Sequence, residues 1–561
     1  MFFSLGELQK AIDQGKDTSP GRDGLGYQLF KQSGDLMGEE MLALINNVWE
    51  GGCLPKEWKH AVIIPIVKPG KQADSPSSYR PIALTSVLCK IMERMITDRL
   101  VDKLEKGGFF GTHQSGFRQG RSTMDAVLSL DMDIKKVMAN KEAVVAVFLD
   151  IEKAYDMLWK EGLQIALYDA GIRGRMFNWI KNFLCNRSIQ VRIGSELSDD
   201  FEVENGTPQG SVISLVLFNI IVNGMFSRVG RGFGFSLFAD DGAIWKRGRN
   251  LPYLFNQIQG ALEKVTEWAN DWGFKISTEK TKCMVFGNKK KMPSQTIKLY
   301  NNNLEKVKYF KFLGMWLDER MTGKKHIELV ALKCGKINNV LRCVAGSDWG
   351  ADRESMMMIC RAMIRSAIDY GCMVYGSAAL SVLNKLDMVQ AKALRVCCGA
   401  FCTTPIAALL IEMGEMPLVL RRYKLGLKYL MKLKGHREVL PTKYLLSDHW
   451  EFMGIRKTKT NFAENLKSVA QEIGIRDVSV CSPVCRSVAP SWLIPVPSVD
   501  LKFMSISKSR ISECVVNEIE VWQQQVWGDH LLIYTDGSKE HESGKVAVGI
   551  SIPEIGYRIG Y

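Results

Sequence analysis

The sequence predicts a protein of the α+β class, in which short strands alternate with amphipathic helices and a long helical segment follows. Apolar runs of strand length recur in the first half of the chain, and the clearest are residues 61–67 and 143–149. Helical periodicity separates such runs, as in residues 86–104 and 251–272. The composition is that of a packed globular chain, since 46% of the residues are hydrophobic and 24% are charged. A largely disordered or fibrous protein is therefore excluded.

The charge balance favours a polyanionic partner. The chain has 74 Lys and Arg against 60 Asp and Glu, which gives a formal net charge of +14. This excess is spread along the whole sequence and suits nucleic acid, although many basic proteins have no such partner. No apolar run approaches the roughly 18 residues that a membrane-spanning helix needs, and residues 1–10 lack the pattern of a secretory signal. The 14 cysteines are irregularly spaced, which favours reduced thiols over a disulfide framework.

The first part of the chain is predicted to open with helices and to continue into a strand, a long helix and a glycine-rich loop. Turn-forming residues at 19–24 separate the first two helices. In chain order we expect helices at 5–12 and 36–49, an edge or bulged strand at 61–67, a helix at 86–104, a loop at 107–122 and then another helix.

The next part alternates strands and helices. The strand at 143–149 ends directly before Asp150, and a helix is expected at 155–170. Further along we expect a hairpin at 189–204, a turn at 206–211, a helix at 212–225, hairpin arms at 233–237 and 243–245 around an Asp-Gly turn, a helix at 251–272 and a strand at 280–286. Beyond these, residues 320–435 are helix-rich and basic, 436–530 have weaker periodicity, and strands are expected at 531–534 and 546–552.

Three carboxylates stand where apolar strands end. Asp150 follows one strand, and Asp240 and Asp241 lie in a tight hairpin. If folding brought them together, their mutual repulsion would be costly unless a cation were bound. Hard oxygen ligands of this kind suit Mg²⁺. The alternative is that Asp-Asp-Gly is only a solvated turn, because Asp and Gly are common turn residues.

Eight short motifs follow one another along the chain around these carboxylates. They are SPGRDG (19–24), SYRPIAL (78–84), QSGFRQGRST (114–123), FLDIEKAYDMLW (148–159), TPQGSVIS (207–214), FADD (238–241), EKTK (279–282) and FLG (312–314). In this order and spacing they closely resemble reverse transcriptases, and in particular those of non-LTR, LINE-type retrotransposons of the jockey and I-element kind. The resemblance runs from about residue 5 to about residue 435.

The resemblance implies a right-hand polymerase with fingers, palm and helical thumb, followed by a truncated RNase H-like β-hairpin. The implied domains are an N-terminal helical extension of the fingers at 1–60, fingers and palm at 61–318, a helical thumb and connection at 319–435, a linker at 436–530 and an incomplete RNase H-like domain at 531–561. Asp536 matches the first metal-binding carboxylate of RNase H. The later carboxylates of that domain do not occur before Tyr561, so we expect no RNase H activity from this chain. The family also carries an endonuclease ahead of the polymerase, so this sequence is expected to be part of a longer element.

The implied activity is RNA-directed DNA polymerisation, with an RNA template, a DNA primer and dNTPs as partners. Two Mg²⁺ ions, or Mn²⁺ in their place, would be the cofactors. Asp150 and Asp240 match the metal ligands of the family, Asp241 is the third carboxylate, and the backbone carbonyl of Ile151 would lie near a metal. Lys280 matches the position proposed as general acid for the departing pyrophosphate.

Four further residues match the nucleotide pocket of the family. Lys68 and Arg80 match the cations that hold the triphosphate, although each could equally be a solvated surface charge. Tyr155 matches the aromatic gate that would clash with a ribose 2′-OH, whereas a tyrosine on an amphipathic helix is more often a core residue. Gln209 matches the residue that lines the nucleotide and template pocket.

Two other motifs match nucleic-acid contacts, with ordinary loop packing as the alternative. The family-specific loop against the template corresponds to Gln114, Phe117, Arg118 and Arg121, and the primer grip corresponds to Phe312, Leu313 and Gly314.

Two positions depart from the family pattern. Phe238 stands where a tyrosine is usual, and Leu215 stands where a proline is usual. Neither is a metal ligand. Together with the incomplete RNase H segment, they motivate the alternative of a catalytically silent nucleic-acid-binding remnant. DNA-templated polymerisation is a third possibility that the same palm chemistry allows.

Overall fold

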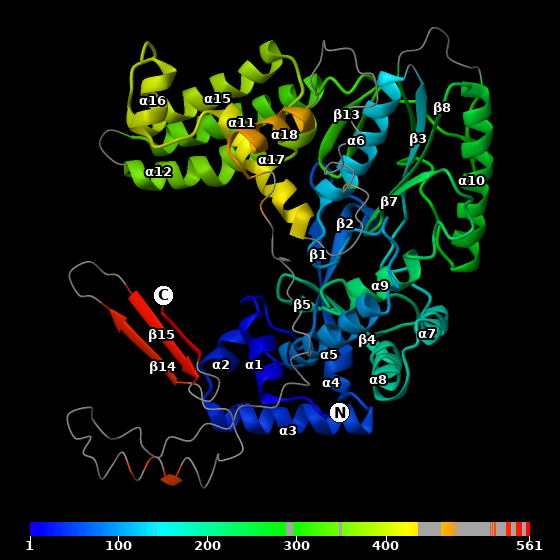
Figure 1. Ribbon diagram of the computed structural model, residues 1–561. Coiled ribbons are helices and arrows are strands. Elements are labelled where there is room, and N and C mark those ends of the chain that lie inside the picture. The colour runs from blue at the N-terminus through cyan, green and yellow to red at the C-terminus, as the bar shows by residue number, and fades with distance from the viewer. Residues whose placement is uncertain are drawn as a thin grey trace. The chain divides into compact units, whose positions relative to one another are not determined.

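The computed structural model describes most of the first 435 residues and shorter stretches beyond them (Figure 1). The described residues are 1–140, 142–287, 295–346, 350–435, 442, 462–475, 478, 517, 519, 521–522, 534–539, 546–552 and 557–560. The chain divides into two compact units, Met1–Ile494 and Pro495–Tyr561, and each is described by itself.

Helices form the N-terminal part of the first unit. They are α1 (Leu5–Asp13), α2 (Tyr27–Gln32), α3 (Asp35–Gly51), α4 (Lys56–Lys59) and, after two strands, α5 (Val87–Lys106). A capping box between Ser4 and Glu7 starts α1, which satisfies backbone N–H groups that would otherwise lack a partner. Arg99 of α5 donates to Glu7 at 2.8 Å, and both side chains are buried. This pair fastens the N-terminal helix to α5.

The first sheet is built around β1 (His60–Val67). It contains β2 (Tyr79–Leu84), β4 (Arg187–Ile193), β5 (Glu196–Leu197) and β6 (Phe201–Val203), with a short 3₁₀ turn η1 (Pro76–Ser78) before β2. β1 pairs antiparallel with β2 over residues 62–67 and parallel with β4 over residues 60–63. Pro65 therefore lies where β1 has a partner on one side, which suits a residue without an N–H donor.

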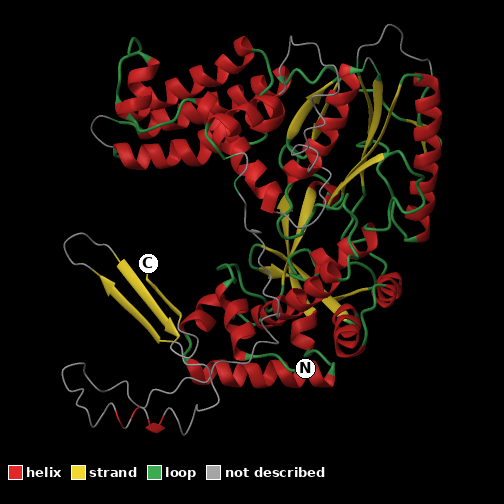
Figure 2. Cartoon of the chain, viewed as in Figure 1, coloured by secondary structure: helices red, strands yellow, loops and turns green. Residues whose placement is uncertain are grey.

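The second sheet has the strand order β7-β8-β3-β9. Figure 2 shows the strands of the chain in yellow and its helices in red. Its strands are β3 (Ala143–Asp150), β7 (Gly234–Phe238), β8 (Asp241–Gly248) and β9 (Lys282–Phe286). Alternate residues of β3 face two different cores, because side chains of a strand point to opposite faces. Val145 and Val147 join the core of α5, α9 and α10, whereas Val144 and Phe148 join the core of α6 and the later helices. β3 is thus covered on both sides, as its continuous apolar sequence predicts.

Helices surround this sheet and link it to the first. They are α6 (Thr123–Ala139), α7 (Lys160–Asp169), α8 (Gly174–Leu184), α9 (Ser214–Val222) and α10 (Leu251–Asp271). Two small hairpins follow β9, namely β10 (Lys298–Leu299) with β11 (Asn302–Asn303), and β12 (Tyr309–Phe312) with β13 (Met315–Asp318).

The described residues that follow β13 in the first unit are mainly helical. Its helices are α11 (Lys324–Val344), α12 (Arg353–Ile359), the π-helical turn η2 (Cys360–Arg365), α13 (Ser366–Asp369), α14 (Cys372–Tyr375), α15 (Leu380–Cys398), α16 (Ile406–Glu412), α17 (Leu418–Gly435) and α18 (Phe462–Glu472). Leu466 of α18 is buried, and an added Cβ on Gly426 of α17 would lie 2.7 Å from its side chain. Part of the segment predicted as a linker thus packs against the helical region.

The second unit contains a three-stranded antiparallel sheet in the order β14-β15-β16. These strands are β14 (Tyr534–Lys539), β15 (Val546–Ile552) and β16 (Tyr557–Gly560). The predicted strand at 546–552 coincides with β15. Of the strand expected at 531–534, only Tyr534 is among the described residues, and it begins β14. Among the described helices, none is long and apolar enough to cross a bilayer. The predicted mixture of helix and sheet is confirmed.

Two local predictions were wrong. The helix expected at 155–170 begins only at Lys160, and Tyr155 lies in a series of turns. The reason is that the 206–207 loop bonds into these turns: Thr207 N–H donates to the Tyr155 carbonyl at 2.9 Å, and Gly206 N–H donates to the Leu158 carbonyl at 2.9 Å.

The second correction concerns the turn between β7 and β8. Phe238 pairs with Asp241, so the two turn residues are Ala239 and Asp240 rather than Asp241 and Gly242. Gly242 lies inside the sheet, opposite Leu237 on one side and Leu149 on the other. Pairing on both sides of β8 therefore decides the register, and Ala239 takes a left-handed φ of 59° as a consequence.

Candidate active site

The sheet brings the three predicted carboxylates together. Asp150 is the last residue of β3 and lies directly opposite Asp241, the first residue of β8. Asp240 occupies the second position of the adjoining two-residue turn. A left-handed alanine is costly for the backbone and persists where the surrounding structure enforces it. The hairpin therefore presents two consecutive carboxylates beside a third from the neighbouring strand.

Asp240 and Asp241 have raised pKa values, caused first by burial and then by neighbouring carboxylates. Burial is the main cause that raises the pKa of Asp241 to about 6, and the charges of Asp240 and Asp150 add to it. The pKa of Asp240 is also raised, chiefly by burial and further by Asp150, while Lys280 and Arg80 act in the opposite direction. Carboxylates in this state gain from a nearby cation.

Lys280 supplies part of that positive charge. Its Nζ donates to Asp150 Oδ2 at 3.0 Å, although most of the lysine side chain is exposed. The segment that carries it runs beside the end of β3, since Ser277 N–H donates to the Asp150 carbonyl at 2.8 Å and Ile151 bridges to Ile276. Lys280 is thus placed next to the acidic cluster by backbone pairing as well as by charge.

The donor set suits a hard divalent cation. Three carboxylates provide the oxygen ligands that such ions prefer. The raised pKa values of Asp240 and Asp241 are consistent with a site where a cation would stabilise the ionised form. In the described part of the chain no three acidic, His or Cys side chains already form a complete ligand set. A bound cation would use Asp150 Oδ2, the oxygen that Lys280 contacts, as one of its ligands.

Two predicted nucleotide-pocket residues lie at one side of the cluster. Tyr155 is half-buried, with its ring centroid 5.1 Å from that of Phe218, and burial together with the charge of Asp240 raises its pKa to about 12. Gln209 Nε2 donates to Asp156 Oδ1 at 3.1 Å, one residue beyond Tyr155. The Gln209 carbonyl accepts from Ala83 N–H of β2 at 2.8 Å. The Gln209 loop therefore joins the turns around Tyr155 to β2.

Arg80 belongs to the same neighbourhood, and Lys68 lies just beyond the end of β1, opposite the residues that precede β2. Arg80 is an exposed residue of β2 whose charge acts on Asp240. Lys68 follows β1, where its Nζ donates to the Ser77 carbonyl at 2.8 Å. The backbone N–H of Lys68 donates to the Ser78 carbonyl at 2.8 Å, which keeps the ends of β1 and β2 together. Both cations thus lie at one end of the first sheet.

The predicted template loop is packed inside the protein over much of its length. The side chain of Gln114 is fully buried and donates to Asn219 Oδ1 at 3.2 Å. Arg118 is buried too, with its guanidinium 2.6 Å from Glu105 Oε2. Phe117 is 39% exposed. The internal contacts of Gln114 and Arg118 are those expected if the loop is ordinary loop packing. Contact of this loop with a template stays a prediction.

A glycine in this loop supports the acidic hairpin. Gly116 lies so close to β7 that an added Cβ would be 2.3 Å from Ala239 N. Ser115 N–H donates to the Leu237 carbonyl at 2.9 Å, and Leu237 N–H donates to the His113 carbonyl at 2.9 Å. The loop therefore extends the sheet next to the hairpin turn. Sequence reasoning placed this motif at the template and did not identify its contact with the hairpin.

A second residue that sequence reasoning missed is Glu93 of α5. It is fully buried and accepts hydrogen bonds from the Ser211 hydroxyl, at 2.5 Å, and from Val212 N–H, at 2.6 Å. Ile213 N–H also donates to it, at 3.2 Å. One carboxylate thus holds the backbone that follows the Gln209 loop. An acidic residue at a buried position of an amphipathic helix was the signal that could have identified it.

The predicted primer grip is the turn between β12 and β13. Phe312 is buried with its ring centroid 5.1 Å from that of Phe148 on β3. Leu313 and Gly314 form the turn, with φ of 45° and 84°. In the second unit, Asp536 lies in β14 opposite Gly549, and its side chain is outside what the structure describes.

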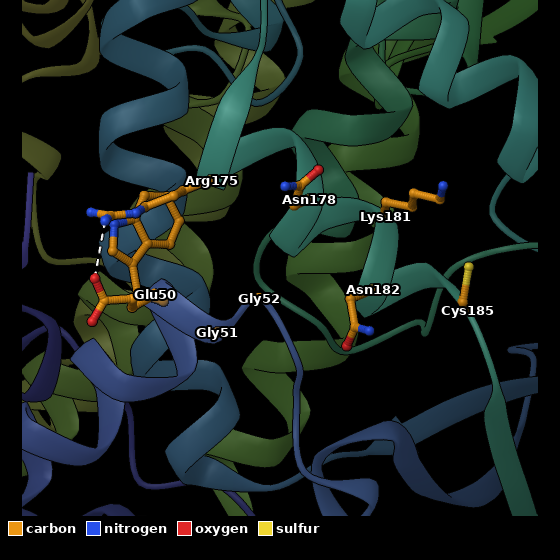
Figure 3. A pocket seen from close by; sticks show the side chains of 9 residues that line it. Glu50, Gly51, Gly52, Arg175, Asn178, Lys181, Asn182 and Cys185 are labelled. Atoms are coloured by element: carbon orange, nitrogen blue, oxygen red, sulfur yellow. Dashed lines mark hydrogen bonds and ion pairs between the residues drawn. The ribbon is translucent and has the colours of Figure 1, made fainter.

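A separate cavity of about 340 Å³ lies between the end of α3 and α8, away from the acidic cluster (Figure 3). Arg175 reaches Glu50 across it at 3.1 Å. Its lining is Trp49, Glu50, Gly51, Gly52, Arg175, Asn178, Lys181, Asn182 and Cys185. None of the predicted site residues is among these, so the cavity is distinct from the candidate active site.

Comparison with known proteins identifies a family that matches the part of the chain containing this site. Residues 66–317 match the family described as reverse transcriptase (RNA-dependent DNA polymerase). These residues form a reverse transcriptase domain. The matched range contains every strand of the sheet β7-β8-β3-β9 and all three carboxylates.

Relatives of the reverse transcriptase domain come from mobile elements of Drosophila melanogaster. A probable RNA-directed DNA polymerase from transposon BS is 32% identical over 368 residues, which are 63% of this chain and 40% of that protein. The RNA-directed DNA polymerase from mobile element jockey is 30% identical over 398 residues, which are 68% of this chain and 42% of that protein. This chain therefore spans about two fifths of the length of these relatives. The predicted kinship with non-LTR retrotransposon reverse transcriptases is confirmed.

Among solved structures, the apo telomerase of Candida tropicalis, truncated from its C-terminal domain, matches with a TM-score of 0.34 and 12% identity. The match covers 52% of this chain and 59% of the telomerase chain.

Proposed function

We propose that this chain is an RNA-directed DNA polymerase of a non-LTR retrotransposon, which extends a DNA primer on an RNA template with dNTPs. The observation that carries the proposal is the meeting of Asp150, Asp240 and Asp241 within the reverse transcriptase domain. The raised pKa values of Asp240 and Asp241 support a cluster built for a bound cation rather than a solvated turn.

In this proposal the architecture is a right hand. The two sheets with their helices would be fingers and palm, residues 319–435 would be thumb and connection, and β14 to β16 would be the start of an RNase H-like domain. The covered faces of β3 support a rigid palm, and a rigid palm keeps the carboxylates at a constant separation.

The acidic cluster would hold two Mg²⁺ ions, or Mn²⁺ in their place. Asp150 and Asp240 would be the ligands, with Asp241 and the Ile151 carbonyl close by. When bound, such ions lower the pKa of an attacking hydroxyl and stabilise a leaving pyrophosphate.

The chain's own residues would place the reactants around this cluster. Arg80 and Lys68 would bind the triphosphate, with Arg80 in a bidentate manner. Tyr155, held by the Gln209 loop, would stack under the sugar and exclude a 2′-hydroxyl. The primer 3′-oxygen forms a bond to the α-phosphorus of the dNTP while the bond to the bridging oxygen breaks. Lys280 would donate a proton to the pyrophosphate that departs.

Primer extension on poly(rA)–oligo(dT) with dTTP and Mg²⁺ tests the proposal. The wild-type chain is expected to extend the primer, and Asp240→Asn is expected to abolish extension while leaving binding of the hybrid intact. Asp271→Asn is a matched control. Asp271 is the last residue of α10, and its exposed carboxylate pairs with Arg228. Extension by Asp240→Asn at the wild-type rate would contradict the assignment.

The second candidate is a catalytically silent remnant that only binds nucleic acid. Phe238 and Leu215 motivate it, although neither contributes a carboxylate to the cluster. A folded wild-type protein that binds the hybrid and does not extend the primer would favour this candidate. Extension on poly(dA)–oligo(dT) alone would instead favour DNA-templated synthesis.

A further inference from the structure

The helical region contacts the predicted primer-grip turn through one tyrosine. Tyr370 follows α13, and its hydroxyl donates to the Leu313 carbonyl in the turn between β12 and β13. The same hydroxyl shares a hydrogen bond of 3.2 Å with the hydroxyl of Thr123, the first residue of α6. Thr123 follows the predicted template loop directly. One side chain thus bridges three segments that are far apart in the sequence.

Close packing joins the Tyr370 segment to the turn between β12 and β13. An added Cβ on Gly314 would lie 3.2 Å from Cε1 and 3.3 Å from the hydroxyl oxygen of Tyr370. An added Cβ on Gly371 would lie 2.0 Å from Sδ of Met315. Each segment therefore offers a glycine against which a side chain of the other packs. These two reciprocal contacts indicate that the two segments are closely packed against each other.

The start of α6 has a second tyrosine contact from the helical region. Tyr429 of α17 is buried, and its hydroxyl lies 2.5 Å from Asp125 Oδ1. Asp125 also accepts from Ser122 N–H at 2.6 Å, which caps the helix. Two tyrosines from different helical segments therefore fasten the helical region to the residues that follow the predicted template loop.

From this geometry we infer that Tyr370 is a positioning residue for primer–template binding. Its hydroxyl holds the predicted primer grip and the end of the predicted template loop in a constant spacing. The side chain is 37% exposed and its hydroxyl bonds to Leu313 and Thr123, so it acts through these two residues rather than on reacting atoms. The inference rests on the proposed function for the identity of the nucleic acid that is bound.

Tyr370→Phe tests the inference, because it keeps the ring against Gly314 and removes only the hydroxyl. The dissociation constant of an RNA–DNA hybrid, measured by fluorescence anisotropy, is expected to rise about tenfold, which corresponds to about 1.4 kcal/mol. The single-turnover extension rate at saturating hybrid is expected to stay at the wild-type level. Thr123→Val should weaken binding too, and its effect should not add fully to that of Tyr370→Phe, since both remove the same contact.

The matched control is Tyr253→Phe. Tyr253 is an exposed residue of α10, and its hydroxyl has no partner among the described residues. Unchanged hybrid binding by Tyr370→Phe would overturn the inference. So would a parallel loss of melting temperature, binding and saturated rate, because that pattern means a structural role only. A wild-type chain that binds the hybrid without extending it contradicts the proposed polymerase and leaves the inference to be judged on the dissociation constants.

Discussion

Substitution of Gly116 by alanine probes the support of the acidic hairpin. The new methyl group would lie 2.3 Å from Ala239 N and 3.0 Å from the Phe238 carbonyl carbon, both of which are backbone atoms. Gly116 cannot easily move away, because its N–H donates to Gln114 Oε1 at 3.1 Å and its carbonyl accepts from Asn219 Nδ2 at 2.7 Å. Overpacking of this kind costs about 1–3 kcal/mol of the free energy of unfolding.

The expected effect on activity is larger than the effect on stability. A displacement of about 1 Å in a catalytic group can reduce a rate by about a hundredfold, and the clash acts directly on the turn that carries Asp240. Urea unfolding and primer extension are to be measured on Gly116→Ala and on Gly260→Ala. Gly260 is the control, since it lies within α10 with open space around it, and alanine there should stabilise the protein by up to about 1 kcal/mol. Wild-type stability together with wild-type extension in Gly116→Ala would refute the reasoning.

Two other predictions concern the site itself. Because the pKa of Asp241 is raised to about 6 from 3.8, the folded state binds its proton more tightly than the unfolded state, so this stabilisation is present at pH 4 and lost as the pH rises through 6. Without divalent cations, Asp241→Asn should therefore raise the melting temperature at pH 8 and leave it nearly unchanged at pH 4. A lower melting temperature of the variant at pH 8 would contradict the raised pKa of Asp241. Tyr155→Val should raise incorporation of ribonucleotides relative to deoxyribonucleotides by about tenfold, whereas Tyr155→Phe, which keeps the ring, should not. If Tyr155→Val selected deoxyribonucleotides over ribonucleotides as strongly as the wild type does, Tyr155 would not be the gate.

Local periodicity was sufficient for most elements of the first 286 residues. The helix expected at 86–104 is α5, at Val87–Lys106, and the strand expected at 143–149 is β3, at Ala143–Asp150. In both elements the hydrophobic pattern is uninterrupted, and the tertiary contacts favour the same secondary structure as that pattern. The positions of Asp150, Asp240 and Asp241 at strand ends also followed from the sequence, because apolar runs stop at them.

The same reasoning failed where a distant segment determines the local conformation. Tyr155 lies in turns because the backbone at 206–207 bonds to residues 155–158. The hairpin turns at Ala239 and Asp240 because β8 pairs with β3 as well as with β7. In both cases the partner is far along the chain, and neither helical nor strand periodicity contains information about it.

By itself, the sequence determined the order of the motifs, the family that they indicate and the residues that carry charge at strand ends. Only the tertiary structure decided which residues hold those charges in place. Glu93 on the Val212 backbone, Gly116 against Ala239 and Tyr370 against Leu313 are all contacts between segments remote in sequence. Their residue types are ordinary for a helix or a loop, so their roles follow from close packing and hydrogen bonding that exist only when the chain is folded.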